Sequence, residues 1–63
     1  MRVTISFGRP AAVTCTWAAF CQDNAAAYSA EEFAAMRARL ERGETIALGG
    51  GAHPDATVRR AAA

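Results

Sequence analysis

Few residues in this chain have side chains suited to covalent chemistry: His53, Cys15, Cys21 and Asp55. A cysteine nucleophile needs a histidine base, a third group that orients the base, and a pocket that holds the substrate. A chain of 63 residues with a single histidine rarely provides such a pocket. We therefore expect no catalytic residues, and we expect the protein not to be an enzyme.

The same residues do not form a recognisable metal or cofactor site. The spacing of Cys15 and Cys21 matches neither a C-x-x-C pair nor a set of zinc ligands, and only His53 is present to assist them. Three glycines at 49–51 invite comparison with a phosphate-binding loop, but the chain contains no lysine and no P-loop pattern. We expect two reduced, mostly buried thiols, a glycine-rich loop between strands, no bound metal and no cofactor.

The element most clearly encoded is a helix at residues 29–42. Ser29 and Glu32 have the spacing of a capping box, and Tyr28 and Phe33 have that of a hydrophobic staple. Apolar residues then recur at helical intervals, arginines lie near the end, and Gly43 follows as a stop signal. This helix is scaffolding, so its apolar side is expected to face the core.

Three further segments read as strands, and a fourth is ambiguous. Apolar and polar residues alternate from Val3 to Phe7, and short apolar stretches at 45–48 and 56–60 predict two more strands, the last of them at an edge of the sheet. Between residues 12 and 22 a strand pattern overlaps a helical one. We expect a strand at 12–15 that passes into a short helix at 17–22, with Thr16 as its N-cap.

Together these elements predict one small α+β domain over residues 1–63, with 61–63 as a tail. An antiparallel sheet of three to four short strands would pack against the main helix. The predicted core comprises Val3, Ile5, Phe7, Val13, Cys15, Trp17, Phe20, Phe33, Met36, Leu40, Ile46, Leu48 and Val58.

Charge and hydropathy exclude several classes of function. The formal net charge is +1, far from the strongly basic balance of a domain that neutralises many phosphates, so we do not favour direct nucleic-acid binding. No stretch approaches the roughly 18 apolar residues of a membrane span, and the N-terminus lacks the pattern of a signal peptide. We expect a cytoplasmic protein that functions as a monomer by binding another protein.

The candidate residues for that contact are acidic. Asp23, Glu31 and Glu32 lie close together in the chain near the start of the main helix. They either complement the helix N-terminus or form an acidic end that contacts a basic partner surface.

Taken as a whole, the chain resembles the small anti-CRISPR proteins that phages and mobile elements encode. The likeness lies in its length, its strand-and-helix layout from Val3 to Arg60 and its lack of catalytic machinery. The resemblance implies a stoichiometric inhibitor that occupies a Cas effector subunit in a bacterial host cell and blocks DNA entry or nuclease recruitment. Members of this class often use acidic surfaces, which here would be the patch of Asp23, Glu31 and Glu32.

Two other functions stay open. The first is a small accessory or antitoxin-like subunit that dimerises or binds its own partner, with the strand at 56–60 or the face of Ala34 and Ala38 as the contact. The second is nucleic-acid binding through arginines, which gather in the later part of the sequence: Arg37, Arg39, Arg42, Arg59 and Arg60.

Overall fold

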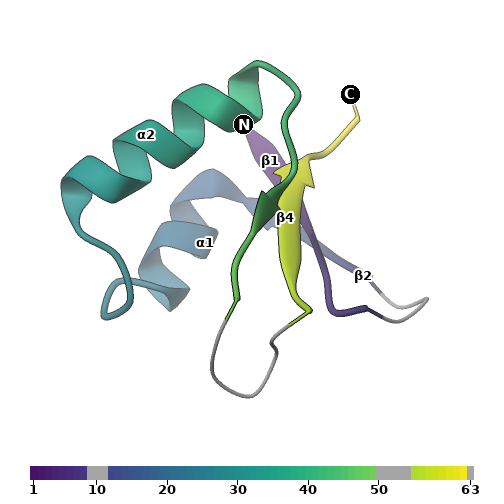
Figure 1. The fold of residues 1–63 in the computed structure, drawn as a ribbon, viewed down its shortest axis with the longest axis horizontal. Coiled ribbons are helices and arrows are strands. Elements are labelled where there is room, and N and C mark those ends of the chain that lie inside the picture. Colours follow the sequence, from purple (N-terminus) through teal and green to yellow (C-terminus); the bar gives the residue numbers. More distant parts are fainter. Residues whose placement is uncertain (9–11, 50–54, 63) are drawn as a thin grey trace.

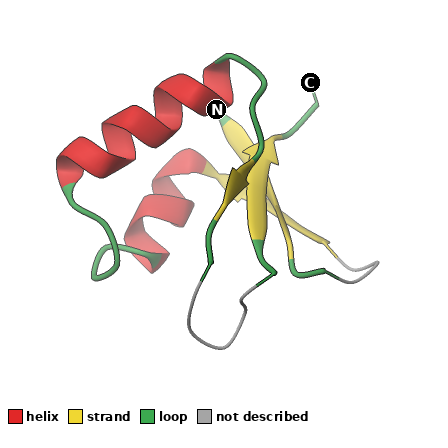
Figure 2. Cartoon of the chain, viewed as in Figure 1, coloured by secondary structure: helices red, strands yellow, loops and turns green. Residues whose placement is uncertain are grey.

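The computed structural model describes residues 1–8, 12–49 and 55–62 of the chain. Its elements, in chain order, are β1 (Arg2–Ser6), β2 (Ala12–Thr16), α1 (Trp17–Asp23), α2 (Ala30–Glu41), β3 (Ile46–Ala47) and β4 (Thr57–Arg60). The strands form one antiparallel sheet in the order β2-β1-β4-β3. Both helices lie on the same side of this sheet, α1 against β1 and β2, and α2 against β3 and β4 (Figures 1 and 2). The predicted α+β class is therefore confirmed.

Both predicted helices form, and local side-chain contacts set their ends. Thr16 accepts a hydrogen bond from the Ala19 N–H at 3.1 Å and so caps α1. At α2 the capping box is complete, because the Glu32 N–H donates to Ser29 Oγ at 3.1 Å and the Ser29 N–H donates to Glu32 Oε1 at 2.9 Å. Gly43, with φ of +86°, ends the helix in the left-handed region.

The core lies between the sheet and the two helices. Its buried residues are Val3, Phe20, Met36, Leu40, Ile46 and Val58, which were predicted, and Ala56, which was not. An aromatic cluster extends this core along the helices: the rings of Trp17 and Phe20 stack at 5.3 Å, and the Phe33 ring meets Tyr28 edge-on at 5.5 Å. The second contact confirms the predicted hydrophobic staple.

Val13 was expected in the core, and this expectation is wrong. Its surface is 52% exposed. The reason is that β2 is an edge strand and α1 begins directly after Thr16, so the helix turns back over the Cys15 end of the strand and leaves Val13 uncovered. Phe7 also falls outside the core cluster, since β1 ends at Ser6 and Phe7 is only half-buried.

The strand at 56–60 was expected at an edge, and this is also wrong. β4 lies inside the sheet between β1 and β3. Its central residue, Val58, is fully buried, while the flanking arginines keep their charged ends at the surface. The true edge on that side is β3, which has only two residues instead of the four predicted.

Two other expectations concern loops and the chain end. The Ala61 N–H donates to the Arg2 carbonyl at 2.9 Å, so residue 61 continues the ladder between β1 and β4 and does not belong to a tail. Most of the glycine-rich loop and His53 lie outside the described residues, as does Ala63.

Candidate interaction surfaces

The three predicted acidic residues occupy two helix ends joined by one loop. Asp23 closes α1 and Glu31 and Glu32 lie in the first turn of α2, with residues 24–29 between them. This loop lies on the side of the molecule away from the sheet (Figure 2). All three residues are exposed, but the Glu32 carboxylate is engaged in the capping box. Within the described part of the chain, Asp23 and Glu31 have no ion-pair partner, so they are the acids left for a partner.

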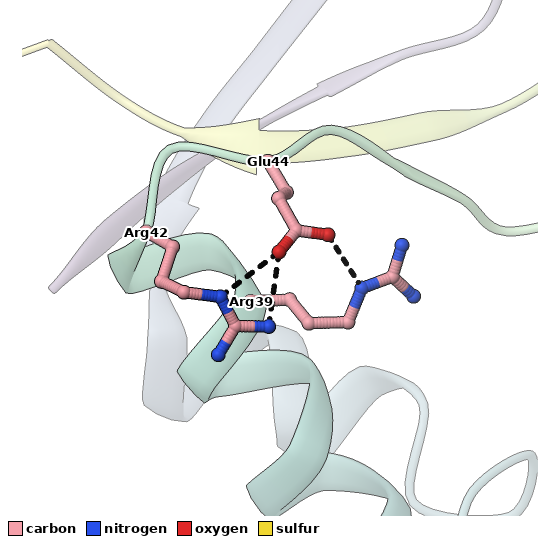
Figure 3. A network of polar contacts seen from close by, with 3 residues as sticks. All are labelled: Arg39, Arg42 and Glu44. Atoms are coloured by element: carbon pink, nitrogen blue, oxygen red, sulfur yellow. Dashed lines mark hydrogen bonds and ion pairs between the residues drawn. The ribbon is translucent and has the colours of Figure 1, made fainter.

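The arginines of α2 and its C-cap, in contrast, are largely neutralised. Arg39 Nε donates to Glu44 Oε1 at 2.9 Å and Arg42 Nε donates to Glu44 Oε2 at 3.0 Å (Figure 3). Hydrogen bonds from Arg39 and then from Arg42 hold the pKa of the Glu44 carboxyl below its ordinary value. Arg37 lies 3.9 Å from Glu41. These arginines therefore fasten the turn after α2, and ion pairs compensate most of their charge.

A different set of polar residues covers the face of the sheet that no helix packs on. Because side chains alternate along a strand, the burial of Val3 and Val58 on the helix side places Arg2, Thr4 and Arg59 on the opposite side. We call this surface the open face. Its remaining strand residues are small or hydroxylated: Ser6, Ala12, Thr14, Thr16, Ala47 and Thr57. The strands of the open face carry no acid; Asp55 precedes β4 by two residues and lies beside Gly8.

The strand register sets a row of side chains across the open face. Thr14 pairs with Thr4, which pairs with Arg59. The hydroxyls of Thr14 and Thr4 lie 3.2 Å apart, and Arg59 Nη1 donates to Ser6 Oγ at 3.5 Å. Thr4, flanked on both sides, is only 9% exposed. The sequence pattern marks these residues merely as the solvent side of strands, so their assembly into one basic, hydroxylated surface was missed.

At the Arg2 end of the open face lies a surface hollow of about 680 Å³. Its described lining contains three arginines and two threonines but no carboxylate: Met1, Arg2, Thr4, Gly43, Thr45, Arg59, Arg60, Ala61 and Ala62. Arg60 Nη1 donates to the Glu41 carbonyl at 3.2 Å, which orients the guanidinium without cancelling its charge. The hollow is thus suited to an anionic group.

The free edge of β2 is a second surface that the sequence did not reveal. The backbone N–H of Trp17 donates to the Met1 carbonyl at 2.8 Å. This bond shows which residues of β2 exchange backbone hydrogen bonds with β1, since such pairs alternate along an antiparallel ladder. The backbone N–H and C=O groups of Val13 and Cys15 therefore face β1, and those of Ala12 and Thr14 face away from the sheet. This edge presents backbone donors and acceptors to whatever lies beside it.

Two free thiols lie among the described residues, without a cluster of metal ligands around them. Among the described residues no group of three or more histidines, cysteines and acids is placed to hold a metal ion. Cys15 and Cys21 are free and half-buried, and burial raises the pKa of the Cys21 thiol, with Arg37 opposing the shift. In the same part of the chain, no helix is both long and apolar enough to cross a membrane.

Comparison of the chain with protein-family models, with curated proteins and with solved structures gives no match. The arguments for function therefore start from the surfaces described above.

Proposed function

We propose that this protein acts without catalysis, by binding another protein along the free edge of β2. The single observation that carries the proposal is that β2 is an exposed edge strand of five residues without the charged residues or prolines that usually protect such an edge. In strand addition, an extended segment of the partner pairs with the outward backbone groups of an edge strand and extends the sheet. Here the partner segment would pair with the backbone of Ala12 and Thr14.

The composition of β2 supports this proposal. Folded proteins protect exposed edge strands with charged residues, prolines, bulges or very short strands. β2 has five residues, Ala12–Thr16, with no charge and no proline, and its Val13 is 52% exposed. The opposite edge, β3, is protected by having only two residues. An unprotected edge of this kind promotes aggregation unless a partner covers it, so a partner strand is the natural occupant.

The size of a stable interface indicates that the edge would not act alone. A standard complex buries about 800 Å² on each partner, which is roughly a fifth of the 4260 Å² that this chain exposes. A partner would therefore extend from β2 onto neighbouring surface. The unpaired carboxylates of Asp23 and Glu31 would add charge complementarity to a basic partner, mainly by steering association.

The first partner to test is a CRISPR effector subunit, because the chain resembles anti-CRISPR inhibitors in size and layout. In that role the protein would cover an effector surface in a one-to-one complex. The test uses purified effector subunits and measures binding of the wild type and of two lysine variants. Val13→Lys places a charge on the edge, whereas Ala38→Lys places the same charge on the exposed side of α2.

We expect Val13→Lys to weaken binding at least tenfold and Ala38→Lys to leave it within twofold, with both variants folded by circular dichroism. Equal affinities for all three proteins would show that β2 is not the contact. Failure of the wild type to bind any effector subunit would remove the inhibitor function. It would leave the edge to be tested with other partners.

The alternative occupant of the β2 edge is a second copy of this chain, because two copies of β2 can pair about a two-fold axis. If two copies pair antiparallel about Thr14, Val13 of each copy lies opposite Cys15 of the other, and the exposed Val13 surface becomes covered. This replaces the dimer contact expected at residues 56–60, because β4 is an inner strand. Size-exclusion chromatography with light scattering distinguishes a second copy from a different partner. A dimer that Val13→Lys dissociates supports the accessory-subunit function, and a monomer excludes this contact.

A further inference from the structure

We propose that the open face and the hollow at its Arg2 end bind the phosphate backbone of nucleic acid, without reading its bases, through Arg2 and Arg59 on the open face and Arg60, which lines the hollow from the helix side of the sheet. This site lies on a different surface from the β2 edge and is independent of the proposed protein partner. Of the five arginines named in the sequence for nucleic-acid binding, it keeps Arg59 and Arg60 and leaves out Arg37, Arg39 and Arg42, which pair with Glu41 and Glu44.

The first argument is the distribution of charge. Among the described residues, Arg2, Arg59 and Arg60 take part in no ion pair, whereas Arg37, Arg39 and Arg42 all do. The polar partners of Arg59 and Arg60 are a hydroxyl and a carbonyl, which leave the positive charges uncompensated. Three arginines without an ion pair therefore line one hollow that no described carboxylate lines, Arg2 and Arg59 from the open face and Arg60 from the helix side. The net charge of +1 conceals this separation.

The second argument is the kind of donor beside the arginines. Thr4 and Thr45 contribute hydroxyls to the same hollow, and Thr14 continues the row across the sheet. Arginine and hydroxyl side chains are the groups that proteins most often direct at phosphate oxygens. A planar guanidinium also donates two parallel hydrogen bonds to one phosphate. The chemistry of the hollow thus matches a phosphodiester.

The third argument excludes base reading and disfavours an acidic protein. The described strand residues of the open face include no aromatic ring on which a base could stack. Apart from its arginines, this face carries no strand side chain larger than threonine, so it lacks the large apolar anchors on which protein interfaces depend. A surface that offers only charge and hydroxyls is suited to a sugar-phosphate backbone.

The experiment measures binding of the whole chain to a fluorescent DNA duplex of about 20 base pairs while salt rises from roughly 50 to 200 mM. Three phosphate contacts predict a slope of log affinity against log salt near −2.7, or a loss of about 40-fold over this range. Arg59→Gln and Arg37→Gln are a matched pair, because each removes one positive charge. We expect Arg59→Gln, and likewise Arg2→Gln, to make the slope shallower by about 0.9, and Arg37→Gln to leave it unchanged.

Four outcomes would overturn the proposal. One is the absence of binding at the lowest salt. Another is an equal effect of Arg37→Gln and Arg59→Gln, which would mean that net charge alone matters. The third is competition by polyglutamate as strong as competition by unlabelled duplex, which would assign the open face to an acidic protein. Inorganic phosphate that competes at concentrations similar to those of duplex phosphate would likewise indicate a small-anion site. Because Val13 lies on the other side of the sheet, Val13→Lys should retain duplex binding whether or not the β2 proposal holds.

Discussion

Glu44 shows how one residue can fasten a turn and also make stability depend on pH. Hydrogen bonds from Arg39 and then Arg42 hold the pKa of its carboxyl below the ordinary value of 4.5. A carboxyl whose pKa is lowered by folding stabilises the fold above its unfolded pKa, and this contribution is lost as the pH falls through the lowered value. The loss therefore belongs to the range below pH 4.5.

We predict that Glu44→Gln lowers the melting temperature at neutral pH and flattens its decline below pH 4.5. Circular dichroism melts over this range provide the measurement. Glu41→Gln is the control, because Glu41 has only a 3.9 Å pairing with Arg37. If Glu41→Gln flattens the decline as much as Glu44→Gln does, the Glu44 contact is not responsible.

At the level of single residues, the sequence predicted contacts between residues close in the chain. It did not predict features that depend on which strands lie side by side. The pairing of Ser29 with Glu32 was predictable because both residues belong to one turn. The exposure of Val13 was not, since it depends on which strand lies at the edge of the sheet. The proposed role of Asp23, Glu31 and Glu32 stays a prediction. Glu32 is a poor position for testing it, because substitution there also breaks the cap.

At the scale of elements, the capping box of α2 should make a measurable contribution to stability. Ser29→Ala removes the acceptor of the Glu32 N–H and leaves the Glu32 carboxylate in place. We predict a loss of about 1 kcal/mol, the usual cost of removing an N-cap side chain. Urea denaturation followed by circular dichroism measures it. Ser29→Asp is the matched variant and should retain most of the stability, because aspartate is also a good N-cap. A loss as large as that of Ser29→Ala would argue against the capping contact.

The helices were predicted more accurately than the strands for a physical reason. A helix carries its caps and its apolar stripe in consecutive residues, and α2 accordingly begins and ends within one residue of the prediction. The extent of β3 instead depends on its partner. Only Ile46 and Ala47 pair with β4, although the apolar pattern covers four residues. The open face could not be located at all before the helices were placed on one side of the sheet.

At the scale of the whole molecule, one small core holds both layers together. Leu40 is fully buried, and α2 contacts β3 and β4. Leu40→Ala should cost about 2–5 kcal/mol. That loss is comparable to the roughly 3–9 kcal/mol expected for a domain of this size. We therefore predict that Leu40→Ala loses about 2–5 kcal/mol of unfolding free energy in urea denaturation, whereas Leu48→Ala, at a half-buried position, loses clearly less. Similar losses in both variants would contradict this assignment of the core.

The order of the strands was beyond local sequence patterns. β1 pairs with β4 across almost the full length of the chain, and the two helices, β2 and β3 lie between them in sequence. No turn signal encodes such a pairing, because it depends on how the intervening elements pack. The two arginines at the end of β4 are typical of an edge strand. In the structure β4 is instead an inner strand, with Val58 buried between β1 and β3.

The pairing of β1 with β4 also determines how the protein responds to force. The strands are antiparallel, and Arg2 lies beside Ala61, so the first and last strands enter and leave the sheet at the same end (Figure 1). Tension applied between these two points pulls across the ladder and breaks its hydrogen bonds one after another. Tension along parallel neighbours would instead load all of the bonds together. The molecule should therefore unzip at low force. Because β1 and β4 are the two central strands, their separation divides the sheet into one pair of β2 with β1 and another of β4 with β3.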